Sequence, residues 1–159
     1  MSKFILKSLV IIFTLSLVAC DKEQEEQYGT INYIGYGTSF GECLGYCVNY
    51  MKVFPDLSRL SRTGWDEFGT LPKIQCSQQL ELYEYVAIRD SINPNNFFFM
   101  DETIGCPDCA DGGAEWIEIS FDTLFHRVTF EYMNEPEELA YVVPLLREMM
   151  TSFTGCEEQ

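Results

Sequence analysis

The chain has few of the residues on which enzymes most often depend. His126 is its single histidine, so a histidine-assisted nucleophile would have to use it, and no nucleophile-elbow sequence accompanies it. No P-loop, dinucleotide-binding fingerprint or H-E-x-x-H motif occurs. His126 begins a predicted strand beside a turn, where a structural histidine is the ordinary expectation. The sequence therefore predicts no catalytic residue and no cofactor, and favours a protein that is not an enzyme.

Basic residues are scarce as well. The chain has 10 lysines and arginines against 25 aspartates and glutamates, a formal net charge of -15. Such a surface repels nucleic acids and anionic lipid headgroups, so nucleic-acid binding driven by counterion release is excluded. Hydrophobic residues make up 47% of the chain and aromatic residues 14%, which is enough for a folded core and excludes a disordered chain.

Apolar runs of membrane-spanning length are missing too. Residues 9–19 are mostly apolar and follow Lys3 and Lys7, but a spanning helix needs ~20 apolar residues. Cys20 follows Leu17-Val18-Ala19, which resembles the lipobox of bacterial lipoproteins. The resemblance implies a signal peptide at 1–19, cleavage before Cys20, and acylation of its thiol with palmitate-type chains that anchor it in a lipid bilayer. A cleaved secretory peptide or an uncleaved anchor helix is the alternative.

A short charged segment separates this anchor from the rest. Residues 21–27, Asp-Lys-Glu-Gln-Glu-Glu-Gln, read as a solvated tether. They also resemble the acidic export signal of surface lipoproteins in Bacteroidota-type bacteria. We expect a signal peptide at 1–19, the lipidated cysteine and acidic tether at 20–28, and a single domain at 29–159. The expected location is the bacterial cell envelope, at the outer membrane or cell surface, with the periplasm-facing side as the alternative.

Strict alternation predicts one β-hairpin. Residues 115–121 place Ile117, Ile119 and Phe121 opposite Trp116, Glu118 and Ser120, and residues 127–133 repeat the pattern after a short turn. Alternation of this kind is typical of antiparallel strands with one face on a core.

The other elements are less sharply marked. Residues 29–40 are β-rich and broken by glycines, 46–54 and 57–63 predict a hairpin around Pro55, and 64–75 predict a loop. Ser77 is a candidate N-cap for a helix that ends near Ile92, and residues 97–100 predict a short buried run, either strand or loop. A last amphipathic helix follows residues 134–138, and Pro144 would kink it or mark the start of its second half.

These elements together predict an α+β fold. The expected order is β-β-(β)-α-β-β-α. We expect an antiparallel sheet of about four to five strands with two helices packed on one face.

Cysteine supplies the candidate cross-links. Outside the cytoplasm, an even set of six predicts disulfides, although 15 pairings are possible. A bond between Cys76 and Cys156 would fix the C-terminus to the domain. The candidates are Cys43, Cys47, Cys76, Cys106, Cys109 and Cys156.

Two other uses of four of these cysteines remain open. Cys43, Cys47, Cys106 and Cys109 have spacings that a zinc–thiolate site would allow. Cys106 and Cys109 also form a C-x-x-C, but a thioredoxin-like motif should follow a strand and open a helix. Here Ala-Asp-Gly-Gly and a predicted strand follow instead.

Two further kinds of site can be proposed from short patterns. Asp101, Glu102, Asp108 and Asp111 could bind calcium through oxygen ligands, although they lack EF-hand spacing and a solvated loop is expected. The triplets that contain Ser91 and Thr123 look like the Asp-Ser/Thr-apolar O-glycosylation acceptor of exported Bacteroidota proteins.

The segment Gly41-Glu-Cys-Leu-Gly-Tyr-Cys-Val48 resembles the F-G-x-C-x-x-Y opening of a small uncharacterised bacterial lipoprotein domain family. Members follow this opening with a helix, a β-hairpin and a closing amphipathic helix. The present chain has Leu-Gly-Tyr where that opening commonly has a proline. The resemblance implies fold and location, and it transfers no catalytic residue.

The sequence thus favours a membrane-anchored, non-enzymatic domain that binds an unknown protein or glycan partner in the envelope. The alternative is a metal- or thiol-dependent protein that uses Cys43, Cys47, Cys106 and Cys109. A module that inhibits a protease is a third hypothesis, because small exported domains closed by disulfides can serve that role.

Overall fold

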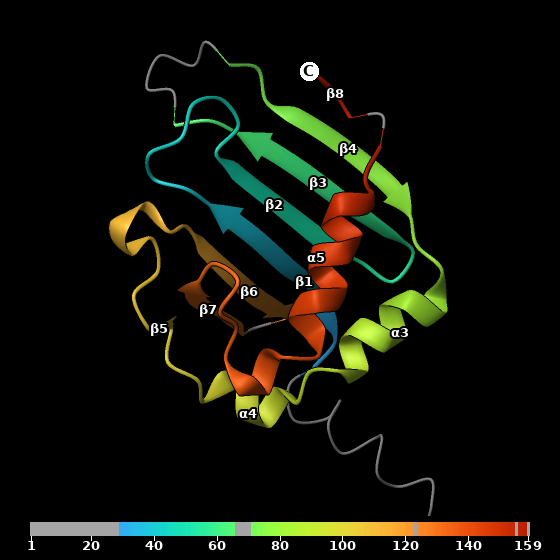
Figure 1. The fold of residues 1–159 in the computed structure, drawn as a ribbon. Helices are drawn as coiled ribbons and strands as arrows, with labels where there is room; N and C mark the ends of the chain where they lie inside the picture. The colour runs from blue at the N-terminus through green and yellow to red at the C-terminus, as the bar shows by residue number, and fades with distance from the viewer. Residues whose placement is uncertain (1–28, 66–70, 123, 155, 159) are drawn as a thin grey trace, which may run out of the picture. The chain divides into compact units, whose positions relative to one another are not determined.

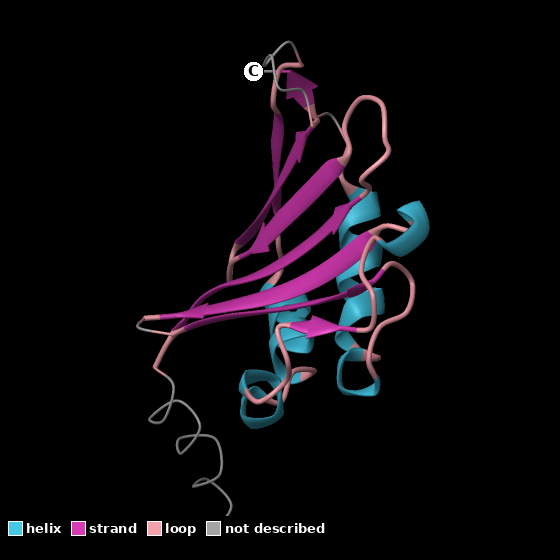
Figure 2. Cartoon of the chain, turned by 90° about the vertical axis from the view of Figure 1, so that its left-hand side faces the viewer, coloured by secondary structure: helices cyan, strands magenta, loops and turns pink. Residues whose placement is uncertain are grey.

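The computed structural model describes residues 29–65, 71–122, 124–154 and 156–158. The expected signal peptide, the lipidated Cys20, the tether and the candidate acceptor Thr123 lie outside these residues. Ile31–Gln159 form one compact unit, in which one β-sheet has its helices on a single face (Figures 1 and 2). The fold is therefore α+β, as the sequence predicts.

The sheet is larger than expected and is mixed rather than wholly antiparallel. Its strand order is β5-β7-β6-β1-β2-β3-β4-β8, and β5 pairs with β7 in parallel. The strands are β1 (Ile31–Ser39), β2 (Val48–Val53), β3 (Leu57–Thr63), β4 (Ile74–Gln79), β5 (Thr103–Ile104), β6 (Ala114–Phe121), β7 (Phe125–Glu131) and β8 (Glu157–Glu158).

Both edges of the sheet are very short. The edge strands β5 and β8 have two residues each, and β8 covers only Ile74 and Gln75 of β4. Among the described residues, most of the outer side of β4 and of β7 therefore has no neighbouring strand. The hairpin predicted around Pro55 is β2–β3, and the hairpin predicted from alternation is β6–β7.

The region after β3 differs most from the prediction. Ser77 lies inside β4 and caps no helix, because β4 pairs with β3 over its whole length. Helix α3 (Leu82–Asp90) begins later, with Glu81 and Glu84 forming a capping box. Residues 97–100 are neither strand nor uniformly buried. They overlap helix α4 (Pro94–Phe98), in which Pro94 occupies the first turn, and the following Phe99 is exposed.

The closing helix also begins later than predicted. Residues 137–139 form a single 3-10 turn, η2 (Glu137–Leu139), and helix α5 runs over Val142–Ser152. Pro144 lies in the first turn of α5, where its missing N–H costs no intrahelical bond. This agrees with the alternative that Pro144 marks the start of the true helix.

The core lies between the sheet and helices α3 and α5. The central strands supply Ile34 and Tyr36, Met51 and Leu60, Ile117 and Val128, and α5 supplies Val142, Val143, Leu146 and Met150. In Figure 2 the helices lie on one side of the sheet, and no described element covers the other side.

Candidate binding face

The uncovered side of the sheet is the candidate binding surface, and we call it the open face. The strand registers place its residues in two rows that cross the sheet. One row is Trp116, Gly37, Tyr50, Ser61 and Gln75, and the other is Arg127, Glu118, Gly35, Lys52, Arg59 and Ser77. Met51, Val53 and Leu60, which alternate with these residues, are buried in the core.

Glycine in β1 explains how a tryptophan and a glutamate become buried on an open face. A Cβ added to Gly37 would lie 2.0 Å from the Trp116 ring, and one added to Gly35 would lie 2.4 Å from the Glu118 side chain. The two side chains of β6 therefore lie across the backbone of β1, and only glycine leaves room for them. Trp116 is 8% exposed and Glu118 is 1% exposed, so β6 is buried on both faces, whereas alternation predicts one buried face.

Glu118 is held by two partners from neighbouring strands. Tyr50 donates its hydroxyl proton to Glu118, and Arg127 donates from Nε at 2.8 Å and from a terminal nitrogen. Burial and the hydrogen bond to Glu118 raise the pKa of Tyr50. The phenol therefore stays protonated, and its ring is fixed beside Trp116, with ring centroids 6.3 Å apart.

The cations of the open face lie over aromatic rings. Lys52 Nζ is 3.8 Å from the centroid of the Tyr33 ring, and the Arg59 guanidinium is 5.4 Å from that of Phe54. The Arg127 guanidinium lies 5.3 Å from Trp116. Such contacts stabilise a cation by about 0.5–2 kcal/mol and still leave part of its charge free for a ligand.

These side chains surround a depression of about 700 Å³ over β2, β3 and β4. Lys52, Arg59 and Lys73 supply positive charge to its lining, and Ser61, Gln75 and Ser77 supply neutral hydrogen-bonding groups. Its described lining includes no acidic residue, although acidic residues greatly outnumber basic ones in the chain. The depression is therefore suited to an anion.

His126 lies at a different place and is structural in character. Its Nε2 is 3.0 Å from the carbonyl oxygen of Met100, and its ring packs edge-on against Phe97. It borders a second hollow of about 480 Å³ with Glu102, Arg127 and Thr129. Among the described residues, the lining of that hollow contains no serine or cysteine. Thr103 and Thr129 are the hydroxyl groups that it does contain.

All six candidate cysteines are bonded in the structure. Cys76 pairs with Cys156 across a sequence separation of 80, as predicted. Cys43 pairs with Cys47 and Cys106 with Cys109, with Cα–Cα distances of 5.6 and 5.5 Å. A zinc–thiolate site at these four sulfurs would first require both short-range bonds to be reduced. The C-x-x-C does not open a helix, since the 3-10 turn η1 (Cys109–Asp111) begins at its second cysteine.

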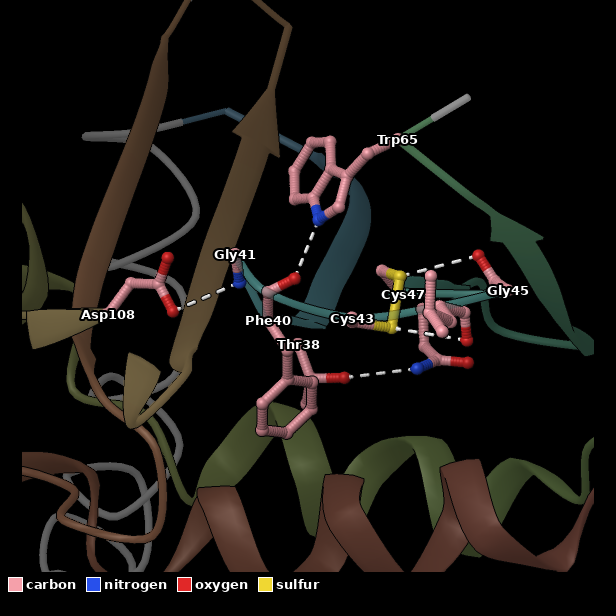
Figure 3. The surroundings of a disulfide bond; sticks show 10 residues. Thr38, Phe40, Gly41, Cys43, Gly45, Cys47, Trp65 and Asp108 are labelled. Carbon is pink, nitrogen blue, oxygen red and sulfur yellow. Dashed lines mark hydrogen bonds between the residues drawn. A yellow bond between two sulfur atoms is a disulfide. The ribbon is translucent and has the colours of Figure 1, made fainter. Parts of the chain in front are cut away.

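One hydrogen bond joins the segments that contain the two short-range disulfides, and Asp108 accepts it (Figure 3). Asp108 Oδ1 accepts from the backbone N–H of Gly41 at 3.1 Å and of Gly113 at 3.2 Å. Trp65 donates its indole N–H to the carbonyl of Phe40 at 2.6 Å. Leu44, between the first pair of cysteines, is fully exposed.

The acidic cluster predicted as a possible calcium site does not converge. Asp108 uses its carboxylate in the loop, and among the described residues no group of three or more His, Cys, Asp or Glu side chains is placed to hold a metal ion. The candidate acceptor Ser91 ends α3, and its hydroxyl donates to the carbonyl of Ala87 at 2.6 Å. Over the described ranges, no helix has the length and apolar character to cross a membrane.

Sequence reasoning missed the open face. Its cations come from three strands and a loop, and only the register brings them together. The one signal available was the pair of glycines in the β1 segment. Comparison with models of protein families gives no match, and comparison with curated proteins gives none either.

Proposed function

We propose that this chain is a lipid-anchored domain of the bacterial envelope, at the outer membrane or cell surface, that binds a partner through its open face without catalysing a reaction. Supporting the anchor is the lipobox-like Leu-Val-Ala before Cys20. The family resemblance around Cys43 and Cys47 supports the proposed location. The observation that carries the proposal is a depression whose described lining has three basic residues and no acidic one, on the sheet face that no described helix covers.

Two of the cations repel each other when no ligand is bound. Cations of like sign placed opposite each other on adjacent strands destabilise a sheet, and Lys52 lies directly opposite Arg59. Aromatic rings offset part of this cost, and an anionic partner would remove the rest. A partner of net negative charge also meets the least repulsion at this place, because the remainder of the chain is acidic.

Two experiments test the proposal. Expression in a bacterial host with labelled palmitate should label the wild-type chain and leave Cys20→Ala unlabelled. The full-length chain in detergent should bind isolated envelope material, separated into protein and glycan fractions, and the combined Lys52→Ala and Arg59→Ala variant should lose that binding. Arg89→Ala, which removes a positive charge from α3, is the control. Equal binding by all variants, or absence of the label, would contradict the corresponding half of the proposal.

A thiol-dependent role is the second candidate, because Cys106 and Cys109 are both exposed and thus accessible to an exchange partner. Titration with glutathione redox buffers tests it. A thiol-dependent protein should reduce this bond at a more oxidising poise than Cys76–Cys156. Resistance of both bonds to the same degree would exclude the role.

A further inference from the structure

Resting on the function proposed above, we infer that the depression over β2, β3 and β4 binds an anionic saccharide. Lys52, Arg59 and Lys73 would take its carboxylate or phosphate groups, and Ser61, Gln75 and Ser77 its hydroxyls. The distribution of charged and neutral groups in the depression favours this ligand over an acidic peptide, a neutral glycan and a simple ion.

Positive charge is spread across the sheet rather than placed at one point. Lys52 and Arg59 are register partners on β2 and β3, and the neutral Ser77 continues the row on β4, with adjacent strands about 4.8 Å apart. A single small ion can contact two of these groups at most. An extended ligand that repeats its acidic groups along the sheet can use the whole row, together with Lys73 just before β4.

Neutral hydrogen-bonding groups form the adjoining row. Tyr50, Ser61 and Gln75 are likewise successive register partners, and Gln75 and Ser77 are exposed. Hydroxyl and amide groups that lie between cations match a ligand whose hydroxyls lie between its acidic groups. A charged sugar has that composition, whereas a chain of acidic amino acids has no hydroxyls to offer.

The depression offers few of the features through which peptides usually bind. Strand addition needs an unpaired sheet edge, and β2 and β3 are each paired on both sides. β4 is covered by β8 only at Ile74 and Gln75, but a strand added to its outer side would lie beside the sheet and not over the depression. Peptide and protein partners also rely on apolar or aromatic anchors buried in pockets. Tyr50 is the one aromatic residue in the described lining, and its hydroxyl is already bonded to Glu118, so its ring is a fixed wall rather than a pocket.

Glu118 acts here as a positioning residue. Its carboxylate holds Tyr50, which lines the depression, and Arg127, which lies on β7 outside it. It is 1% exposed, so it presents no negative surface to the ligand. Glu118→Gln should weaken binding mainly through the loss of a fixed Tyr50 ring, and the fluorescence of Trp116 should report that movement.

Binding of defined probes to the full-length chain in detergent tests the inference. Short oligogalacturonate should bind. The affinity should fall about tenfold in each of Lys52→Ala and Arg59→Ala, as expected for the loss of one charge-assisted hydrogen bond, and stay unchanged in Arg89→Ala. Gln75→Ala should weaken binding and leave its salt dependence as it was, because the amide carries no charge. Circular dichroism verifies that each variant is folded.

Ligands that differ in one property show whether the depression recognises the charge, the sugar or both. Methyl-esterified oligogalacturonate keeps the sugar and loses the charge, polyglutamate keeps the charge and loses the sugar, and both should bind at least tenfold more weakly. A phosphorylated sugar that binds as tightly as the uronate would support the inference and point to phosphate as the acidic group. Inorganic phosphate alone should not compete.

Three results would overturn the inference. They are equal binding of polyglutamate, equal binding of the methyl ester, or no binding of any charged saccharide. These failures are distinguishable from failure of the proposed function. Envelope material that still binds in a Lys52- and Arg59-dependent way would preserve the open face as a binding surface for another anion. Binding of envelope material that depends on neither Lys52 nor Arg59 would show that the open face is not the binding surface.

Discussion

Strand β6 contains two buried glutamates, Glu115 and Glu118. Each one is bonded to a tyrosine and an arginine, but they lie on opposite faces of the sheet. Glu115 accepts from the Tyr36 hydroxyl at 2.7 Å and from Arg147 of α5 at 3.1 and 2.8 Å. Glu118, on the other face, accepts from the Tyr50 hydroxyl and Arg127. Each site is thus a carboxylate, a tyrosine and an arginine, one beneath a helix and the other beneath no described element.

The difference shows what each site does. Arg147 is 23% exposed and also pairs with Glu135 at 3.0 Å, so the covered site ties the closing helix to the sheet. Burial and the hydrogen bond to Glu115 raise the pKa of Tyr36, while the hydrogen bonds that Arg147 donates to Glu115 and Glu135 raise the pKa of Arg147. Arg127 is 45% exposed, so the open site orders side chains at a surface and leaves them accessible.

Removing each arginine in turn is the strongest way to break this comparison. Arg147→Ala leaves Glu115 buried without its cation and should lower the free energy of unfolding by about 3–5 kcal/mol. Arg127→Ala should lower it by about 1 kcal/mol, because water can reach the exposed side of that pair. Urea denaturation at neutral pH measures both. Equal losses would mean that the open site is as important for stability as the covered one.

A methyl group added to β1 should disturb the open face alone. Gly37→Ala places a Cβ against the Trp116 ring, and the forced movement should cost about 1–3 kcal/mol. Trp116 fluorescence should change, and binding of envelope material should weaken with it. Gly112→Ala, where a Cβ would meet only the Cys109 carbonyl at 3.1 Å, is the control. Unchanged fluorescence in Gly37→Ala would show that the glycine is not required for Trp116 to lie over β1.

Acid should weaken the covered site in a predictable direction. Burial opposes ionisation of Glu135, but hydrogen bonds from its own backbone N–H and from Arg147 outweigh it and hold its pKa below the usual 4.5. The unfolded chain therefore binds this proton first, so the stabilisation is present above about pH 4.5 and is lost as the pH falls through the folded value. Glu135→Gln should be less stable at pH 7 and lose less on acidification.

Denaturation of Glu135→Gln and of wild type across that pH range measures the difference. Glu138→Gln removes the same charge from an exposed neighbour of the same segment and serves as the control. Parallel curves for Glu135→Gln and wild type would show that Glu135 does not contribute to the acid dependence.

Strands β6 and β7 were predictable because their apolar residues alternate with polar ones. Ile117 and Ile119 of β6 and Val128 and Phe130 of β7 pack on the core, and the burial of the other side of β6 was not predicted. β4 was missed because Ile74 is its single strongly apolar residue and polar side chains line both faces. Periodicity cannot detect a strand that lies near a sheet edge and buries little.

The candidate site could not be predicted for a different reason. Nothing in the local sequence distinguishes Lys52, Arg59 or Gln75 from other polar residues. They form a candidate site only because the registers of β2, β3 and β4 bring them together. The Cys76–Cys156 pairing was predicted correctly, although the reasoning placed Cys76 at the start of a helix and it lies inside β4.

The position of β1 has a mechanical consequence. β1 is the first strand of the domain, yet it lies inside the sheet, antiparallel to β2 on one side and to β6 on the other. If the chain is held at Cys20, a pull on a bound partner reaches the anchor through the N-terminal end of β1. That strand can leave the sheet only if two ladders of hydrogen bonds are broken, whereas an edge strand is held by one. A domain tethered in this way can resist drag on its ligand without a larger core.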